Sequence, residues 1–396
     1  MAQEGYVQDL ALGLFRSDYM VHVNSRSTQY SPGIKQVEFN TIASSFGGLS
    51  SKVSALHRHL QSINAYPPLQ SSIINESSLP QSKSIPSLAA GLAAAHNAYG
   101  KPRSGKPLCV IFLVQDPERN VFDQRHLQYA LSADHGVPVY RLPFSKIIDY
   151  THLTDDRTLL YLPPHSPGTA FEVTTVYFRA GYSPDDYAGA EDWQARLHLE
   201  RSRAIKCPSV LTQLAGCKKI QQVLATPNSP HLAKFLPDEE EAQRVLETFA
   251  PIYPMDDSEA GKEAKKLATD PSAAMKFVLK PQREGGGNNI YRKAIPEFLK
   301  DTPEDHWPAY ILMEMIEPPA QRNVIFRNGE IQSGGVICEL GIYGVCLWRH
   351  GDDAGNGEVL ENWEAGYLLR TKGDQSEEGG VAAGFGAVDS CCLLDL

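Results

Sequence analysis

Four short apolar runs in the middle of the chain constrain its fold more than any other feature. They are Leu108–Val114, Val137–Leu142, Thr158–Leu162 and Val173–Phe178. A helical pattern from Asp123 to Asp134 separates the first two runs. Strands that alternate with helices favour a parallel sheet covered by helices. We therefore expect a parallel α/β unit in this part of the chain.

The segment before this unit combines a helix and a strand. Apolar residues up to about Phe15 predict a helix, and the alternation over Ile34–Ile42 predicts a strand. That alternation places Gln36, Glu38 and Asn40 on one face of the strand. A polar strand face of this kind is either exposed to solvent or lines a binding site.

The charge balance and the cysteines narrow the classes of protein. Against 47 acidic residues there are 37 basic ones, a formal charge of -10. This disfavours a general nucleic-acid or membrane-surface binder, because both need a cationic face. No apolar run approaches the ~20 residues of a membrane span. The seven cysteines match neither a zinc pattern nor a disulfide framework, and the first residues do not read as a signal peptide, so we expect a cytosolic protein.

A glycine-rich segment from Lys280 to Tyr291 is the strongest local signal of chemistry. It contains three consecutive glycines, whose backbone N–H groups can approach an anion closely. Lys280 before the loop suits a phosphate, and Glu284 is a hard oxygen ligand that suits Mg²⁺. The alternative is a flexible hairpin turn with charged flanks. The phosphate-binding P-loop motif and the dinucleotide-binding glycine motif are both absent from the chain.

Sequence blocks from near the first residue to nearly the last resemble one enzyme family. The blocks are Gly13–Met20, Lys35–Gly48, Glu118–Arg125, Val176–Tyr182, Gln213–Lys219, Lys280–Tyr291, Tyr310–Glu317, Glu339–Ile342, Leu368–Lys372 and Gly379–Gly384. Through them the chain resembles eukaryotic-type glutathione synthetase, an ATP-grasp ligase. The resemblance implies ATP-dependent joining of γ-glutamylcysteine to glycine through an acyl phosphate.

The resemblance also implies the architecture of the molecule. The fold class would be α/β, an ATP-grasp body with a lid and an embedded parallel α/β substrate-binding domain. Residues 1–106 would form the N-terminal part of the body, and residues 107–216 the substrate-binding domain. Residues 217–396 would complete the body and lid, with the glycine-rich loop and a C-terminal loop of small residues. The resemblance implies a homodimer, and we expect this chain to lack the segment that precedes the Gly13–Met20 block in the family.

The family's metal and nucleotide sites carry over to matching residues of this chain. Mg²⁺ would be held by Glu38, Asn40 and Glu284. The residues that match the family's ATP site would bind the phosphates through their charge or backbone N–H groups, or would lie beside the adenine. They are Glu38, Lys218, Lys280, Glu284, Gly285, Gly286, Gly287, Asn288, Asn289, Tyr291, Met313, Glu314, Met315, Ile316, Glu339, Lys372 and Glu378.

The peptide site carries over in the same way. Arg16, Lys280 and Arg370 would act as catalytic residues, and planar guanidinium groups suit carboxylates. The residues that match the family's substrate site are Arg16, Ser45, Glu118, Arg119, Asn120, Gln124, Arg179, Tyr182, Arg370, Val381 and Ala382. Val381 and Ala382 belong to the small-residue loop, which would close over the substrate. A simple flexible turn is the alternative for that loop.

Two other functions stay open at this point. A ligase of the same class could accept β-alanine or serine in place of glycine, with the residues around Val381 and Ala382 deciding the choice. A form without the N-terminal segment could instead bind nucleotide or peptide without turnover.

Overall fold

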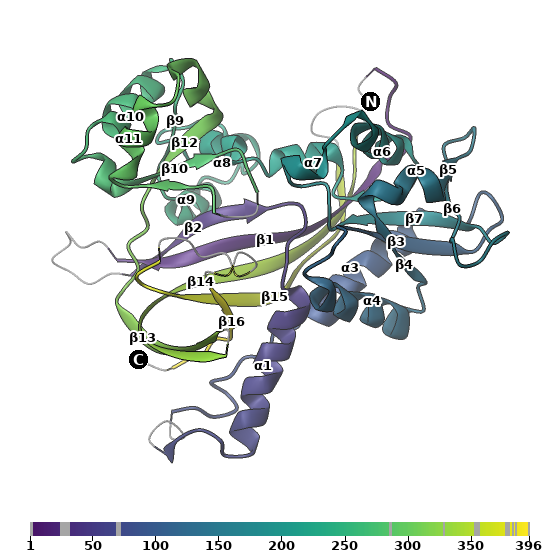
Figure 1. The fold of residues 1–396 in the computed structure, drawn as a ribbon, viewed down its shortest axis with the longest axis horizontal. Coiled ribbons are helices and arrows are strands. Elements are labelled where there is room, and N and C mark those ends of the chain that lie inside the picture. The colour runs from purple at the N-terminus through teal and green to yellow at the C-terminus, as the bar shows by residue number, and fades with distance from the viewer. Residues whose placement is uncertain are drawn as a thin grey trace.

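One large sheet runs through the whole molecule (Figure 1). In this computed structural model the described residues are 3–23, 32–68, 73–284, 287–327, 329–351, 357–376, 381, 384 and 386–394. Gly285, Gly286, Glu378 and Ala382 therefore lie outside the described residues. The main path of the sheet has the order β16 (Ala387–Asp389), β15 (Glu358–Gly373), β14 (Glu330–Arg349), β1 (Leu10–His22), β8 (Ile205–Cys207), β7 (Phe171–Phe178), β3 (Leu108–Val114) and β4 (Val139–Pro143).

The middle of the chain forms the parallel α/β unit that the apolar runs predict. β3 pairs in parallel with both β4 and β7, and β7 pairs in parallel with β8. The run near residue 160 is different, because β6 (Leu159–Tyr161) pairs antiparallel with β7 and with β5 (Thr151–Leu153). Helix α4 (Val121–His135) connects β3 to β4.

Helices cover both faces of this parallel unit. Val110 and Phe112 of β3 pack in the cluster that includes α4 and α3 (Ser84–Tyr99), whereas Ile111 packs in the cluster of α5 (Ile147–Tyr150) and α6 (Ala190–Arg201). Each fully buried aliphatic or aromatic side chain contributes ~1.5–3 kcal/mol through its removal from water. This burial on both faces explains why β3 is apolar along its whole length.

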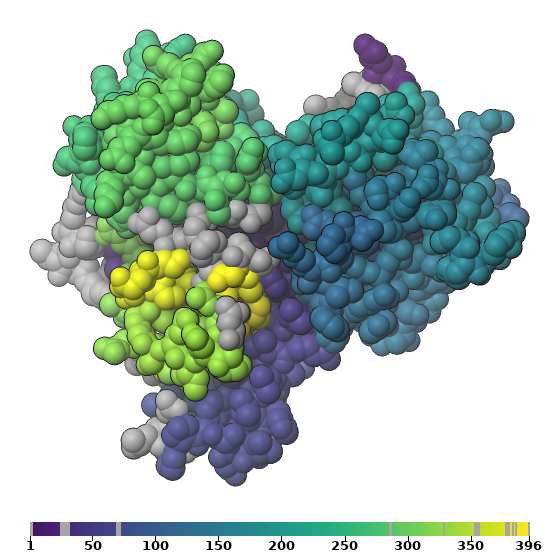
Figure 2. Space-filling view, viewed as in Figure 1, coloured from purple at the N-terminus to yellow at the C-terminus, as the bar shows by residue number. Residues whose placement is uncertain are grey.

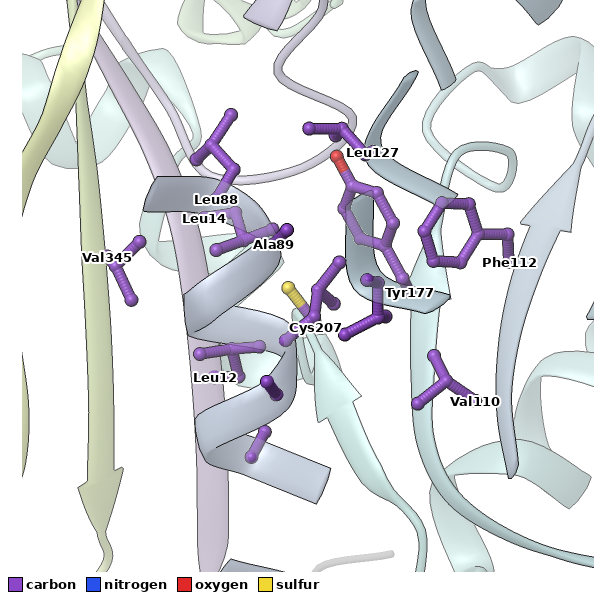
Figure 3. Packing of buried hydrophobic residues seen from close by; sticks show 14 of the residues in the cluster. Leu12, Leu14, Leu88, Ala89, Val110, Phe112, Leu127, Tyr177, Cys207 and Val345 are labelled. Carbon is purple, nitrogen blue, oxygen red and sulfur yellow. The ribbon is translucent and has the colours of Figure 1, made fainter. Parts of the chain in front are cut away.

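The N-terminal apolar residues form a strand, so the helix expected up to Phe15 is wrong. In β1, Leu12 and Leu14 pack against Leu88 and Ala89 of α3 (Figure 3). On the opposite face Phe15 lies 5.3 Å from the ring of Phe39. Because both faces of this strand are covered, small and apolar residues follow one another. The alternation of apolar and polar side chains that usually marks a strand is therefore absent here.

Strand β1 joins two kinds of sheet. It pairs in parallel with β8 and antiparallel with β14 and with β2 (Gly33–Asn40). β13 (Gln321–Arg327) extends the antiparallel part beyond β14. Helix α1 (Gly47–Ser62) follows β2 and projects from the body (Figure 1).

A smaller sheet forms a separate lobe, drawn in green in Figure 1. Its order is β11 (Ile290–Tyr291), β10 (Phe277–Pro281), β12 (Tyr310–Glu314) and β9 (Ile252–Pro254). The helices of this part of the chain are α8 (Lys218–Ala225), α9 (Glu239–Thr248), α10 (Glu259–Thr269) and α11 (Ala294–Lys300). The helix expected over residues 211–224 is divided into α7 (Val210–Ala215) and α8.

The small-sheet lobe and the α/β part stand apart on one face of the molecule, with a hollow between them (Figure 2). The lobe is tied to the large sheet through β2, since Lys35 Nζ donates hydrogen bonds to the carbonyls of Glu247 and Phe249. Within the described part of the chain, the helices are all too short or too polar to cross a bilayer.

Candidate active site

A cavity of about 390 Å³ lies where the antiparallel part of the large sheet faces the small-sheet lobe. Its walls come from β1, β2, β14 and β15 on one side and from β10, β11 and β12 on the other. The predicted site residues that line it are Arg16, Glu38, Asn40, Ser45, Tyr182, Lys280, Glu284, Asn289, Tyr291, Met313, Glu314, Met315, Ile316, Glu339, Arg370, Lys372 and Val381.

Strand register brings the charged residues of the large sheet together. On β1 and β2, Arg16 lies opposite Asn40 and Asp18 lies opposite Glu38. On β14 and β15, Glu339 lies opposite Arg370. Directly opposed residues on one face of an antiparallel pair have Cβ atoms ~5 Å apart. Residues far apart in sequence thus share one polar surface beneath the cavity.

A bulge changes one residue of the predicted polar face. The register between β1 and β2 shifts after Asp18, so that Tyr19 lies opposite Gln36 rather than Val37. Val37 lines the cavity, whereas Gln36 is turned toward Ser17 and donates a hydrogen bond to its hydroxyl at 2.8 Å. The extra residue of a bulge reverses the alternation on one side of it. The prediction that Gln36 shares a face with Glu38 and Asn40 is therefore wrong.

Two lysines approach this region from the small-sheet lobe and its neighbour α8. Lys280 is almost fully buried, and its Nζ donates to the carbonyl of Val37 at 3.1 Å, which joins β10 to β2. Lys218 donates to the carbonyl of Arg283 at 2.7 Å and lies 3.8 Å from Glu284 Oε1. Lys218 lines a second cavity of about 310 Å³, which also contacts Tyr182 and Glu284.

The cations control the ionisation of the neighbouring carboxylates. Burial would raise the pKa of Glu38, but Lys218, Arg370 and Lys280 outweigh it and lower the pKa to about 2. Burial raises the pKa of Glu284 despite the opposing effect of Lys218, and the negative charge of Glu38 adds to this rise. Glu38 is thus ionised at neutral pH and repels a charge on Glu284.

The repulsion between Glu38 and Glu284 allows the fit of a cation to these residues to be tested. Among the described residues no group of three or more His, Cys, Asp or Glu side chains could hold a metal ion. The donor set here is smaller: two carboxylates, Glu38 and Glu284, with the amide of Asn40. Mg²⁺ commonly uses one or two carboxylates and fills its other positions with water and phosphate oxygens. The residues therefore fit Mg²⁺ in the company of a phosphate ligand.

A turn between β2 and α1 forms another wall. Arg179, at the end of β7, is buried behind this turn and donates to the carbonyl of Ser44 at 2.9 Å and to the hydroxyl of Ser45 at 2.8 Å. Tyr343 donates to the carbonyl of Ser45 at 2.6 Å. Arg16 donates to the same carbonyl at 3.1 Å. The turn is thus held by the same large sheet that carries the charged residues.

The predicted residues around α4 lie farther from the cavity wall. Asn120 donates its backbone N–H to Glu118 Oε1 at 2.8 Å, and Gln124 accepts a hydrogen bond from Arg141 at 2.6 Å. Arg119 is exposed. Some predicted residues in the described part of the chain line neither cavity. They are Arg179 and the four residues near α4, which are Glu118, Arg119, Asn120 and Gln124.

Two buried carboxylates were missed by the sequence argument. Asp18 accepts hydrogen bonds from Arg16, Arg370 and Asn40. Asp123 accepts the backbone N–H groups of Phe46, Gly48 and Leu49, at the start of α1. The signal for Asp18 was its position two residues after Arg16, which puts both side chains on one face of a strand. No comparable signal marked Asp123.

Comparisons with known proteins show which family the sequence resembles. The model of the family "Eukaryotic glutathione synthase, ATP binding domain" matches residues 1–393. The chain is 40% identical over 406 residues to the glutathione synthetase large chain of Schizosaccharomyces pombe, covering 99% of this chain and 77% of that one. It is 41% identical over 391 residues to the glutathione synthetase of Homo sapiens, covering 98% and 76%.

A solved structure supports the fold. The apo form of a glutathione synthetase-like effector, GSS30 from Globodera pallida, matches with a TM-score of 0.72 over 98% of this chain and 77% of that one. Sequence identity is 20%. This likeness concerns the α/β architecture alone.

Proposed function

Because the chain belongs to the eukaryotic glutathione synthase family, we propose that it joins γ-glutamylcysteine to glycine at the expense of ATP, giving glutathione, ADP and phosphate. The observation that carries the proposal is the cavity that gathers Arg16, Lys280 and Arg370 around the acidic pair Glu38 and Glu284. Cations of this kind suit the carboxylates and phosphates of the substrates, and the acidic pair suits a metal ion.

The chemistry explains why such a cavity is needed. An ionised carboxylate resists attack by an amine, so the carboxylate is first converted to an acyl phosphate by ATP. The amine of glycine then attacks the acyl carbon, and the carbon–oxygen bond to phosphate breaks as the new carbon–nitrogen bond forms. The acyl phosphate must be kept from water during this interval. Fixed cations stabilise the charge that accumulates on the transferred phosphoryl group.

We assign the phosphate-binding role to Lys280 and Lys218, which both lower the pKa of Glu38, and Lys218 also lies 3.8 Å from Glu284. Arg16 and Arg370 would orient substrate carboxylates through planar N–H pairs. Glu38, Asn40 and Glu284 would hold Mg²⁺, which supplies charge neutralisation to the phosphates when bound. The positive surroundings that keep Glu38 ionised support its part in this set.

The adenine would lie beside Tyr291 and the Met313–Ile316 segment. Two backbone N–H groups there are already used, since Glu314 donates to Pro251 and Met315 donates to Lys276. Recognition of adenine by the backbone would therefore rely on carbonyl groups or on Ile316. Glu339, Lys372 and the loop residues Gly287, Asn288 and Asn289 would complete the nucleotide site.

The peptide would lie toward Ser45 and Tyr182, with Val381 on the lid side of the cavity. Arg179 would act from behind the Ser44–Ser45 turn. Glu118, Arg119, Asn120 and Gln124 keep their proposed part in substrate binding, which requires the region around α4 to approach the ligand. Residues 107–216 would then serve as the substrate-binding domain. We also propose a cytosolic homodimer, for which the free cysteines and the family resemblance are the support.

A coupled assay of ADP release tests the activity. Purified protein with γ-glutamylcysteine, glycine and Mg-ATP should release ADP, and omission of glycine should abolish steady turnover. Absence of glycine-dependent turnover would refute the proposal. Competition with β-alanine or serine distinguishes the acceptor, because a better substrate of this kind would replace glycine in the reaction.

The acidic pair gives a variant that separates chemistry from folding. Glu284→Gln keeps the shape of the side chain but removes its charge, so we expect turnover to fall about 100-fold with little change in thermal stability. Glu297→Gln on the exposed face of α11 is the matched control and should behave like the unchanged chain. If Glu284→Gln unfolds while the control does not, Glu284 has a structural role instead.

A further inference from the structure

We propose that Asp18 is a positioning residue of the reaction, because its single buried carboxylate holds both Arg16 and Arg370 and links them to Asn40. The inference rests on the proposed function, since it concerns the two arginines of that site and the amide of Asn40, a proposed metal ligand. The family resemblance assigned Asp18 no role, and only its spacing from Arg16 set it apart in the sequence.

The contacts of Asp18 use its whole carboxylate. Arg16 donates from Nε to Oδ1 at 2.6 Å and from Nη2 to Oδ2 at 2.8 Å, which is a bidentate pair. Arg370 Nη2 donates to Oδ2 at 2.8 Å, and Asn40 Nδ2 donates to the same oxygen at 3.0 Å. Three of these four bonds converge on Oδ2 and one ends on Oδ1, so both oxygens of the carboxylate are engaged.

Asp18 acts through the arginines and does not reach a ligand itself. Its side chain is fully buried, and Asp18 is not among the residues that line the cavity, whereas Arg16, Arg370 and Asn40 all are. The second carboxylate beside Arg370 is different, because Glu339 contacts Arg370 and lines the cavity. Of the two carboxylates that contact Arg370 within the described residues, Asp18 is thus the one that a ligand cannot displace directly.

The shared carboxylate solves an electrostatic problem. Arg16 and Arg370 carry like charges close enough for each to disfavour the other's protonated form, and Arg16 lowers the pKa of Arg370. Asp18 acts in the opposite direction on both guanidinium groups. Glu339 raises the pKa of Arg370 more strongly than Asp18 does, but Asp18 is the carboxylate that bonds both guanidinium groups, so its loss would leave their mutual repulsion less compensated. Since buried ion pairs add little net stability, the gain from this arrangement is geometry rather than folding energy.

The opposing strand is adapted to this pair. Gly341 of β14 lies opposite Asp18, and a β-carbon there would lie 2.7 Å from both Asp18 Oδ1 and Arg16 Cδ. Only glycine leaves room for the arginine and the aspartate to pack side by side against this strand. Gly334 on the same strand faces open space and offers a control.

The test compares Asp18→Asn, Gly341→Ala and Gly334→Ala. Asp18→Asn replaces an acceptor oxygen by an amide nitrogen that faces N–H donors, so we expect kcat/KM for γ-glutamylcysteine to fall about 100-fold. Gly341→Ala keeps every charge but displaces the pair, so it should lower kcat/KM by about tenfold. The loss should be divided between kcat and KM in the same proportion as in Asp18→Asn. Gly334→Ala should match the unchanged chain.

Chemical rescue distinguishes positioning from folding. In Asp18→Ala, formate should enter the vacated space and restore part of the lost turnover, a response that a merely structural role would not produce. If Asp18→Asn does not fold, Gly341→Ala decides the question by the same kinetics. The inference is overturned if the folded variants keep the kcat/KM of the unchanged chain, or if formate restores nothing. A lack of turnover in the unchanged chain would instead refute the proposed function, and the inference with it.

Discussion

The carboxylate of Asp123 should stabilise the start of α1 and, through it, the turn that carries Ser44 and Ser45. Asp123 lies in the first turn of α4 and is almost fully buried. It accepts the N–H groups of Phe46 at 2.8 Å, Gly48 at 2.7 Å and Leu49 at 3.1 Å. Its negative charge also faces the positive end of α1. Phe46 is held there in a left-handed conformation, with φ of 71°.

The substitution Asp123→Asn gives a magnitude that can be worked out. The amide retains one acceptor oxygen, which can keep the N–H groups of Gly48 and Leu49, but Phe46 loses its partner. A buried N–H left without a partner costs ~1–3 kcal/mol, and the lost charge at a helix N-terminus adds ~0.3–1 kcal/mol. We therefore expect the free energy of unfolding to fall by about 3 kcal/mol.

Urea denaturation followed by tryptophan fluorescence measures this loss from the midpoint and the slope. The matched control is Asp134→Asn on the same helix, whose side chain is exposed and should change the free energy of unfolding by less than about 0.5 kcal/mol. The Michaelis constant for γ-glutamylcysteine should rise in Asp123→Asn, because the turn contacts Arg16 and Arg179. Equal stability of the two variants would refute this reasoning.

Two further predictions concern other buried groups. Tyr343→Phe removes the hydroxyl that donates to the carbonyl of Ser45, so it should lower the free energy of unfolding by about 1 kcal/mol and raise the Michaelis constant for γ-glutamylcysteine. The exposed Tyr129→Phe is its control in both assays, and equal constants for the two variants would contradict the prediction. Burial lowers the pKa of Lys206 to about 8 from 10.5, with Glu200 opposing and Arg196 adding to the shift. The unfolded chain therefore holds this proton to higher pH than the folded protein, and stability relative to Lys206→Met should increase by about 3 kcal/mol between pH 8 and 10.5. Unfolding free energies of both proteins at several pH values measure this, and a constant difference would rule it out.

The sequence predicts the parallel α/β unit well because β3 is buried on both faces and reads as a continuous apolar run, and β7 is buried along nearly its whole length despite Glu172, Thr174 and Thr175. The same property caused the error at β1. Six residues from Leu10 to Phe15 are all apolar or glycine, and a strand buried on both sides gives no alternation to distinguish it from a buried helix. Only the pairing of β1 with β14 and β8 resolves the choice.

The candidate site shows a similar limit. Motif resemblance identified Arg16, Glu38, Asn40 and Arg370, and the structure brings them to one cavity. Whether those assignments describe the working enzyme stays a prediction. The spacing of Asp18 from Arg16 is a local signal, but the bond of Asp18 to Arg370 depends on cross-strand register, which no local pattern encodes. The position of Gln36 depends on a bulge, whose extra residue cannot be recognised from alternation alone.

The central place of β1 also affects how the chain can be made in a cell. Its register places Leu10 opposite Arg349, so two segments that lie far apart in the sequence pair with each other. Pairing between such distant segments is slow, because a very long loop must close first. Until β14 is synthesised, the apolar residues of β1 have no neighbour on that edge. Nascent chains should therefore expose this edge of β1 until β14 has been made, whereas the parallel strands β3, β4, β7 and β8 can pair earlier.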